Sequence, residues 1–310
     1  MKYARIAATG SYLPPKIMTN ADLEAIVETN DAWIQQRTGI KQRHIVAADD
    51  NVVSMAAKAA RKALDTAELK PQDINMIIVA TCSSEHVFPS AACMLQQALG
   101  MPNCPAFDVQ AACSGFMYAL SIATQFIATQ QCQRILIVGS EAMSKVVDWT
   151  DRSSCILFGD GAGAMILEAS ATPGIFSTHL NSDGNFKDVL FLRNGEHVQM
   201  QGNTVFKMAV KWLSEVATEA LVANNMQAAD IDWVVPHQAN IRIIQSTVKL
   251  LNIPLEKVIV TVAEHANTSA ASIPLALDIA IRDGRIVRGQ NLLFEAFGGG
   301  LTWGSALVRY

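Results

Sequence analysis

Short apolar runs alternate with amphipathic stretches along the 310-residue chain. Runs of about four to eight β-branched and aliphatic residues predict buried strands, and the longer stretches between them have the spacing of helices. Strands that alternate with helices indicate a parallel or mixed sheet layered with helices, so the pattern predicts an α/β fold. The predicted strands are 76–81 (MIIVAT), 134–140 (RILIVGS), 233–236 (WVVP), 258–263 (VIVTVA) and 291–296 (NLLFEA).

The order of these elements recurs within the chain. Each half has an apolar strand, a helix, a turn that opens a helix of apolar and small residues, and a closing strand marked by glycine. We therefore predict two similar α/β halves that face each other, residues 1–170 and residues 171–310. The paired segments are 73–83 with 230–240, 89–100 with 240–252, 108–123 with 262–280, and 158–168 with 302–310.

Composition narrows the class of protein. The chain is 50% hydrophobic, which supports one large domain or two tightly fused ones. A formal net charge of −4 gives no basic field that would attract nucleic acid or anionic lipid. The N-terminus lacks the apolar region of a signal peptide, and polar residues interrupt the most apolar helix, 113–129, so we expect no membrane span.

Six cysteines are present, without a C-x-x-C pair and without a histidine at metal-ligand spacing. We expect reduced and mostly buried thiols, no metal site, and a cytoplasmic location. The glycine-rich segment 158–164 (FGDGAGA) suggests dinucleotide binding, but a strand and not a helix follows it, so we reject that interpretation.

Three residues are candidates for catalysis. Cys113 lies between a strand-like run and an apolar helix, where the helix dipole favours a thiolate. His237 and Asn267 follow predicted strands of the second half, so two facing halves would bring all three into one cleft at the carboxyl ends of the strands. Each residue alone also fits a structural role: Cys113 in the core, His237 in packing, and Asn267 as a helix cap.

A glycine triplet at 298–300 permits close approach of the backbone to a substrate, and it also fits a tight hairpin. One of its N–H groups, together with that of Cys113, would form an oxyanion hole.

Taken together, the segments AACSGF, PHQAN, ANTSAAS and FGGGLTWGSALVRY resemble the β-ketoacyl-acyl carrier protein synthase III family, and the resemblance runs essentially end to end. It implies the thiolase-like fold, with duplicated halves in five αβαβα layers and a homodimer. It also implies that Cys113 is acylated by a short acyl-CoA such as acetyl-CoA and that His237 and Asn267 assist decarboxylation of malonyl-acyl carrier protein (ACP). The products are 3-oxoacyl-ACP, CoA and CO₂, and no cofactor is involved.

The resemblance also assigns binding residues, which otherwise fit ordinary core or surface roles. Gly299 would complete the oxyanion hole, Phe88 would floor the acyl pocket of the partner subunit, and Ala266 replaces a common glycine. Leu250 stands where some members carry a second base. The CoA contacts would be Trp33, Arg37, Arg152, Gly202, Phe206, Ala239 and Asn240, and the ACP contacts Lys207, Gln238, Arg242 and Lys249.

Three alternatives remain open at this point. Another thiolase-fold enzyme, such as a type III polyketide synthase or an acyltransferase, would use the same three residues with a different extender. A cysteine hydrolase would release no CO₂. A non-catalytic scaffold would have no need for Cys113, His237 and Asn267.

Overall fold

Two sheets with related strand order form the frame of the protein in a computed structural model that describes residues 2–310. The first sheet has the order β1-β7-β6-β4-β5, and the second, β8-β13-β12-β11, repeats its first four positions. In the first sheet β4 is parallel to β5 and β6, and in the second β11 is parallel to β12. The strands are β1 (Tyr3–Tyr12), β4 (Met76–Ala80), β5 (Ala106–Val109), β6 (Arg134–Ala142), β7 (Asp160–Ser170), β8 (Ile175–Ser182), β11 (Trp233–Pro236), β12 (Asn291–Gly298) and β13 (Thr302–Arg309).

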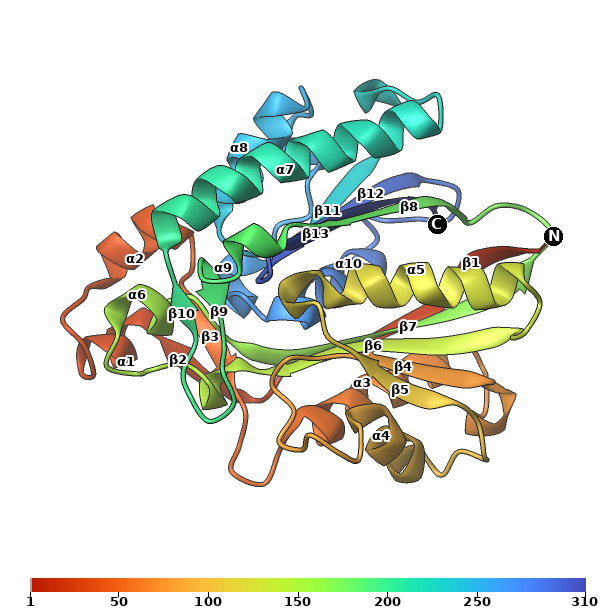
Figure 1. Cartoon of the computed structure of the whole chain (residues 1–310), viewed down its shortest axis with the longest axis horizontal. Helices are drawn as coiled ribbons and strands as arrows, with labels where there is room; N and C mark the ends of the chain where they lie inside the picture. The colour runs from red at the N-terminus through yellow and green to blue at the C-terminus, as the bar shows by residue number, and fades with distance from the viewer. Residues whose placement is uncertain (1) are drawn as a thin grey trace.

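Helices complete five layers, as Figure 1 shows. Helices α5 (Gly115–Ala128) and α10 (Ser272–Arg282) lie between the two sheets. Helices α7 (Gly202–Ala223) and α8 (Ile241–Leu250) cover the outer face of the second sheet. The outer face of the first sheet is covered by α3 (Val52–Thr66) and α4 (Ala91–Leu99). The predicted αβαβα architecture is therefore confirmed.

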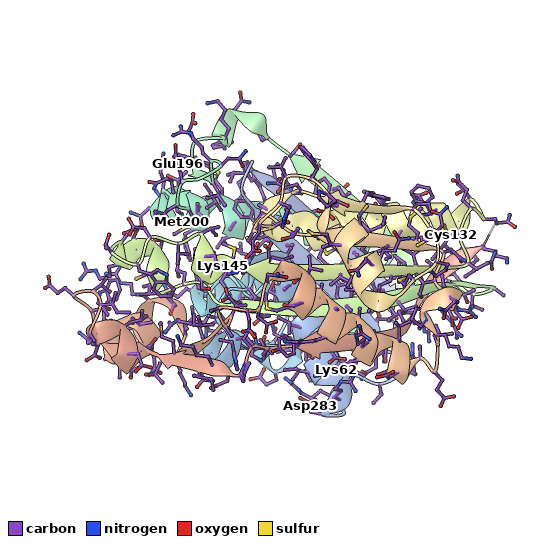
Figure 2. The ribbon with its side chains drawn as sticks, turned by 90° about the horizontal axis from the view of Figure 1, so that it is seen from below. Lys62, Cys132, Lys145, Glu196, Met200 and Asp283 are labelled. Carbon is purple, nitrogen blue, oxygen red and sulfur yellow. The ribbon has the colours of Figure 1, made fainter. Side chains whose placement is uncertain are left out.

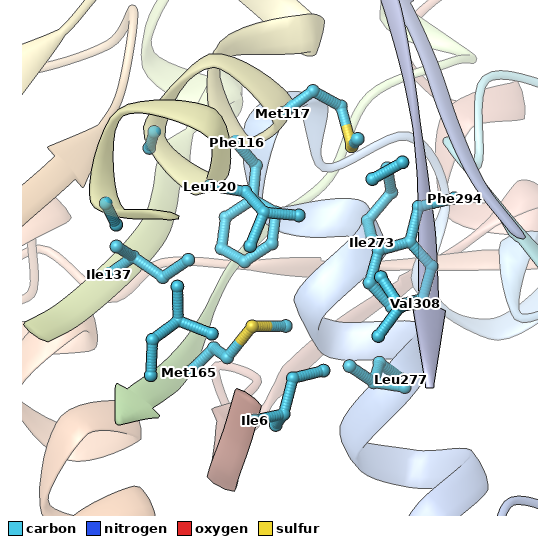
Figure 3. Close-up of a cluster of buried hydrophobic side chains, with 14 of the residues drawn as sticks. Ile6, Phe116, Met117, Leu120, Ile137, Met165, Ile273, Leu277, Phe294 and Val308 are labelled. Carbon is cyan, nitrogen blue, oxygen red and sulfur yellow. The ribbon is translucent and has the colours of Figure 1, made fainter. Parts of the chain in front are cut away.

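The largest hydrophobic cluster fills the space between the sheets and holds the two central helices in place. Phe116 and Leu120 of α5 meet Ile273 and Leu277 of α10, together with side chains from both sheets (Figure 3). Each fully buried side chain of this size contributes about 1.5–3 kcal/mol relative to exposure. The sequence predicted that α5 is buried, and half of its residues are, although Gln125 is exposed and the other residues are partly buried.

The predicted strand 258–263 is not formed. Only Val258 pairs with the sheet, through one parallel bridge to Val234. Beyond it the backbone N–H groups of Thr261 and Val262 donate to the side-chain Oε1 of Gln238 at 2.8 and 3.1 Å. The side chain of Gln238 therefore accepts the hydrogen bonds that a neighbouring strand would otherwise accept. The short helix α9 begins at Val262.

The smaller elements gather at the end of the molecule opposite the two termini (Figure 1). Figure 2 shows Met200 and Glu196 of the β9–β10 hairpin far from Cys132, which follows the C-terminal end of α5. Within residues 2–310, none of the helices has the length and apolarity needed to cross a membrane. The remaining elements are β2 (Lys16–Thr19), α1 (Asn20–Glu24), α2 (Asp31–Thr38), β3 (Gln42–Ile45), α6 (Arg152–Cys155), β9 (Leu190–Phe191), β10 (Gln199–Met200) and α9 (Val262–His265), with short 3₁₀ helices at Pro71–Asp73, Ala112–Ser114, Met143–Lys145, Gly184–Phe186, Ala228–Asp230, Leu255–Lys257 and Ser269–Ala271.

Candidate active site

A cavity of about 690 Å³ has walls from both halves of the chain. Cys113 of the first half and His237 and Asn267 of the second half all line it. Within residues 2–310 no group of three or more His, Cys, Asp or Glu side chains could hold a metal ion. The cavity walls also contain the following residues predicted from the sequence: Trp33, Arg37, Arg152, Gly202, Phe206, Ala239, Asn240, Arg242 and Gly299.

Cys113 lies in the 3₁₀ turn that precedes α5, at the carboxyl end of strand β5. Burial raises the pKa of its thiol to about 12, although a hydrogen bond with Ser269 opposes the shift. Loss of hydration therefore opposes the thiolate that the helix end was expected to favour. At neutral pH the sulfur carries its proton.

His237 follows strand β11 and is only 5% exposed. Its backbone N–H donates to the carbonyl oxygen of Glu295 at 2.7 Å, and its ring Nδ1 lies 2.6 Å from the hydroxyl of Ser272. Burial lowers the pKa of the imidazole to about 4, so the ring is neutral at physiological pH. Because Nδ1 is engaged by Ser272, Nε2 is the ring nitrogen left for chemistry in the cavity.

Asn267 lies in the turn between α9 and α10, where its backbone pairs with the segment 157–159 of the first half. Its side-chain Oδ1 accepts the backbone N–H of Ser269 at 2.8 Å. With the carbonyl oxygen of the carboxamide occupied, the Nδ2 group is the part available to a ligand. The side chain therefore serves both the turn and the cavity. It does not act as the helix cap that the sequence also allowed, because Thr268 and Ala271 hold the N-cap positions of the following helices.

The glycine triplet approaches the nucleophile turn closely. A Cβ atom on Gly298 would lie 2.8 Å from the backbone nitrogen of Cys113, so only glycine fits there. Gly299, the next residue, lines the cavity. Thr302 ties the same loop down, because its hydroxyl donates to the carbonyl oxygen of Ala111 at 3.0 Å.

Aromatic rings and guanidinium groups line the outer part of the cavity. The guanidinium carbons of Arg37 and Arg152 lie 5.2 and 4.8 Å from the centre of the Trp33 ring, and that of Arg242 lies 5.3 Å from the centre of the Phe206 ring. A flat base between Trp33 and Arg152 would need roughly 7 Å between them, two van der Waals spacings. Arg152 must therefore move outward to admit a base at this position.

The predicted docking residues differ in accessibility. Lys207 and Lys249 are exposed on α7 and α8, and Leu250 beside Lys249 is 59% exposed. Gln238, in contrast, is 1% exposed, and its amide donates to the carbonyl oxygens of Pro236 and Ile259. The prediction that Gln238 contacts a carrier protein is therefore wrong, since every polar group of its side chain is used inside the fold.

Phe88 lies outside the cavity of its own chain. It is 84% exposed, and its neighbour Val87 is 86% exposed. Two adjacent apolar side chains left in solvent are unusual for a monomer and are typical of a contact surface.

Several polar residues around the cavity carried no signal in the sequence. Ser272 contacts His237, Ser269 contacts Asn267, and Cys82 lines the cavity near Glu141. Serine and cysteine are common in such segments, so only the tertiary contacts mark them. The expectation of mostly buried cysteines holds only in part. Cys132 and Cys155 are buried and Cys93 is exposed, whereas the other three thiols are partly buried: Cys82, Cys104 and Cys113.

Comparisons with known proteins point to one family over the whole chain. A family model described as 3-oxoacyl-[acyl-carrier-protein] synthase III matches residues 107–184, and the model of the C-terminal part of the same family matches residues 221–310. The β-ketoacyl-[acyl-carrier-protein] synthase III of Methylococcus capsulatus is 57% identical, with 100% of this chain and 99% of the relative covered. That of Alkalilimnicola ehrlichii is 54% identical, with 100% of both chains covered.

Solved structures agree. The crystal structure of 3-oxoacyl-[acyl-carrier-protein] synthase III from Aquifex aeolicus matches with a TM-score of 0.97 and 45% identity, covering 99% of this chain and 100% of the other. OleA of Xanthomonas campestris shares the fold, with a TM-score of 0.91 at 21% identity and 100% of both chains covered.

Proposed function

The chain belongs to the β-ketoacyl-[acyl-carrier-protein] synthase III family and is a condensing enzyme, and on that premise we propose how its own residues carry the reaction. A short acyl-CoA, such as acetyl-CoA, acylates Cys113, and malonyl-ACP then condenses with the acyl group. The products are 3-oxoacyl-ACP, CoA and CO₂. The observation that carries the proposal is that Cys113, His237 and Asn267, from opposite halves of the chain, line one cavity.

Acylation begins from a thiol and a neutral imidazole. His237 accepts the proton of Cys113 at Nε2 while the sulfur attacks the thioester carbonyl carbon of acyl-CoA. The backbone N–H groups of Cys113 and Gly299 stabilise the oxyanion of the tetrahedral intermediate. When the carbon–sulfur bond to CoA breaks, the imidazolium returns the proton to the departing CoA sulfur, which leaves His237 neutral again.

Condensation uses the same two side chains as hydrogen-bond donors. The carbonyl oxygen of the malonyl thioester lies between Nε2 of His237 and Nδ2 of Asn267. Cleavage of the carbon–carbon bond releases CO₂ and leaves its electron pair as an enolate, whose charge these donors stabilise. The enolate carbon attacks the acyl group on Cys113, and the sulfur is released to take up a proton.

Ser272 allows His237 to act in both steps. A hydroxyl group can donate or accept, so the contact of 2.6 Å with Nδ1 is compatible with either neutral tautomer of the ring. With Ser272 accepting from Nδ1, Nε2 is free to take the proton of the thiol. With Ser272 donating to Nδ1, Nε2 carries the proton that the enolate oxygen needs.

The substrates enter past the outer part of the cavity. Trp33 and Arg152 would hold the adenine of CoA, and Arg37 would contact its phosphates. The pantetheine arm would pass the remaining predicted contacts, which all line the cavity: Gly202, Phe206, Ala239 and Asn240.

The acidic carrier protein would dock on the exposed cations near this opening. Arg242, on helix α8, lines the cavity. Lys207 is exposed on helix α7, and Lys249 is exposed on α8. Because the chain has a formal net charge of −4, this local basic surface and not the whole-molecule field would attract the partner.

The assembly would be a homodimer in which the exposed Phe88 reaches the acyl pocket of the partner subunit. A bulky ring at the floor of the pocket favours a short primer. The reaction transfers no electron and is balanced by protein and substrate groups alone, so it needs no cofactor. Six free cysteines fit a reducing compartment, and we place the reaction in the cytoplasm.

Mass spectrometry of the intact protein tests the assignment. With acetyl-CoA we expect one acetyl adduct, which the Cys113→Ser variant loses. The His237→Ala and Asn267→Ala variants should both still form the adduct, but His237→Ala should form it more slowly than Asn267→Ala because it lacks the acceptor of the thiol proton. Condensation with malonyl-ACP should fall by about 10²–10³-fold in each, because each lacks one donor to the enolate.

The extender separates the alternatives. A polyketide synthase would accept malonyl-CoA in place of malonyl-ACP, and a cysteine hydrolase would lose the adduct to water without CO₂ release. An adduct that never condenses with malonyl-ACP contradicts the proposed function.

A further inference from the structure

A buried carboxyl group lies behind the cavity and has no place in the reaction described above. Glu141, at the end of strand β6, is 0% exposed, and burial raises the pKa of its carboxyl group. No lysine, arginine or histidine of residues 2–310 forms a salt bridge with it. A buried acid without a cation is costly unless hydrogen bonds satisfy its oxygens.

Those hydrogen bonds come from both halves of the chain. From the segment after strand β4, the backbone N–H of Cys82 donates at 3.1 Å and the hydroxyl of Ser83 at 2.5 Å. From the turn before α10, the hydroxyl of Ser269 donates at 2.9 Å and the backbone N–H of Ala270 at 3.5 Å. Glu141 therefore ties the turn that carries Asn267 to the sheet that leads to Cys113.

Ser269 connects this carboxyl group to the carboxamide of Asn267. While the Ser269 hydroxyl donates to Glu141, its backbone N–H donates to Oδ1 of Asn267 at 2.8 Å. That bond holds the oxygen of the carboxamide away from the substrate and leaves Nδ2 for the cavity. If the carboxamide turned over, it would present its oxygen to the enolate and repel the developing negative charge.

We propose that Glu141 is a positioning residue for the carbon–carbon bond-forming step: by holding Ser269, it keeps Nδ2 of Asn267 aimed at the malonyl thioester. The inference rests on the donor role of Asn267 in the proposed function. Because acylation does not use Asn267, the part of the Glu141 effect that passes through Asn267 belongs to the second half-reaction. Ser269 also contacts the thiol of Cys113, so the rate of acylation must be measured beside that of condensation.

The Glu141→Gln variant tests this, since it keeps the shape of the side chain but replaces one acceptor oxygen by an N–H donor. We expect acetyl-Cys113 to form within about 3-fold of the wild-type rate. Condensation of the pre-acylated enzyme with malonyl-ACP should fall by about 10²-fold in kcat, with KM changed much less, as for loss of one transition-state donor.

A double-mutant cycle then relates Glu141 to Asn267. If Glu141 acts through Asn267, the Glu141→Gln/Asn267→Ala variant should condense no more slowly than Asn267→Ala alone. The matched control is Asp160→Asn, a second buried carboxyl group, which accepts the backbone N–H groups of Val46 and Ser144 and contacts neither Ser269 nor Asn267. It should leave the ratio of the two half-reaction rates unchanged.

The outcomes separate the inference from its premise. Suppose that Asn267→Ala is defective in condensation. The inference is overturned, and the proposed function stands, if Glu141→Gln condenses at the wild-type rate or slows acylation as much as condensation. The same holds if the double variant condenses more slowly than Asn267→Ala alone. If Asn267→Ala itself condenses at the wild-type rate, the donor role fails and the inference fails with it. Should Glu141→Gln not fold, the Ser269→Ala variant decides. Its condensation rate should fall by about 10-fold and by more than its acylation rate, although Ser269 also contacts the Cys113 thiol, and condensation at the wild-type rate would overturn the idea.

Discussion

At the scale of single residues, unusual backbone conformations surround the catalytic groups. Ala112, Ala266 and Ser269 have φ angles of 46°, 57° and 49°, and they flank Cys113 and Asn267. Non-glycine residues in sparsely populated regions cost about 1–3 kcal/mol each and persist where the surrounding structure enforces them. With ψ at −162°, Ala266 occupies a region that essentially only glycine adopts.

From the sequence, Ala266 is known only as replacing a glycine that is common in the family. The structure shows that backbone freedom is the relevant difference. Ala266 is also 0% exposed, so its methyl group packs in the core while its backbone is strained.

We therefore predict that Ala266→Gly raises the free energy of unfolding by about 1 kcal/mol, because relief of strain exceeds the added entropy of the unfolded chain. Thermal unfolding followed by circular dichroism at fixed protein concentration measures the difference. The control Ala276→Gly, in the middle of α10, should lower stability by about the same amount. Equal destabilisation by both substitutions would contradict the argument from strain.

At the scale of elements, the end of strand β12 sets the geometry of the nucleophile turn. A Cβ atom at Gly298 would meet the backbone nitrogens of Cys113 and Ser114 at 2.8 and 3.0 Å and the carbonyl oxygen of Ala111 at 3.1 Å. All three atoms belong to the backbone, so none can rotate away as the end of a flexible side chain would.

The Gly298→Ala variant should therefore displace the turn that supplies the Cys113 N–H to the proposed oxyanion hole. We expect the rate of acetyl-Cys113 formation to fall by about 10²-fold or more, as intact mass measured over time would show. Gly184→Ala is the matched control, since a Cβ atom there meets nothing within 4 Å, and its rate should not change. Normal acylation by Gly298→Ala would mean that the turn does not need this close approach.

At the scale of the whole molecule, three buried titratable groups make stability depend on pH. Burial lowers the pKa of His237 and of His265 to about 4 and raises the pKa of Glu295 to about 8. The histidines contribute stability that is fully present above about pH 6.5 and is lost as the pH falls toward 4, because the unfolded chain then binds protons that the folded one does not. Glu295 contributes stability that is present below about pH 4.5 and is lost as the pH rises toward 8.

The Glu295→Gln variant isolates one of these effects. Between pH 6.5 and 8, its free energy of unfolding should rise relative to the wild type by about 2 kcal/mol, because the wild-type carboxyl group must stay protonated in the fold. Thermal unfolding of both proteins across this range provides the comparison. A difference that stays constant with pH would show that Glu295 ionises in the folded state much as it does in the unfolded chain.

Features that depend on neighbours along the chain were determined by the sequence itself. Apolar periodicity located strands β4, β6, β11 and β12 and the buried helix α5, because burial on one or all faces leaves a repeating pattern of side chains. The internal repeat predicted two similar α/β halves, and the resemblance to the family implied their five layers. The positions of Cys113 and His237 at the ends of strands predicted their meeting in one cavity, since the carboxyl ends of parallel strands share an edge of a sheet. Asn267 lines the same cavity although the strand predicted before it is not formed.

Features that depend on groups distant in sequence were decided only by the tertiary structure. Gln238 lies within a recognisable motif, yet it is buried, and its side chain accepts N–H groups of the segment that was predicted to be a strand at 258–263. The thiol of Cys113 keeps its proton because the folded chain removes water from it, which no local pattern records. Glu141 meets Ser269 across 128 positions of sequence, and its role follows from that contact alone. Hydration and hydrogen-bond partners are properties of the packed molecule, so the sequence indicated which groups react and the fold decided how they are held.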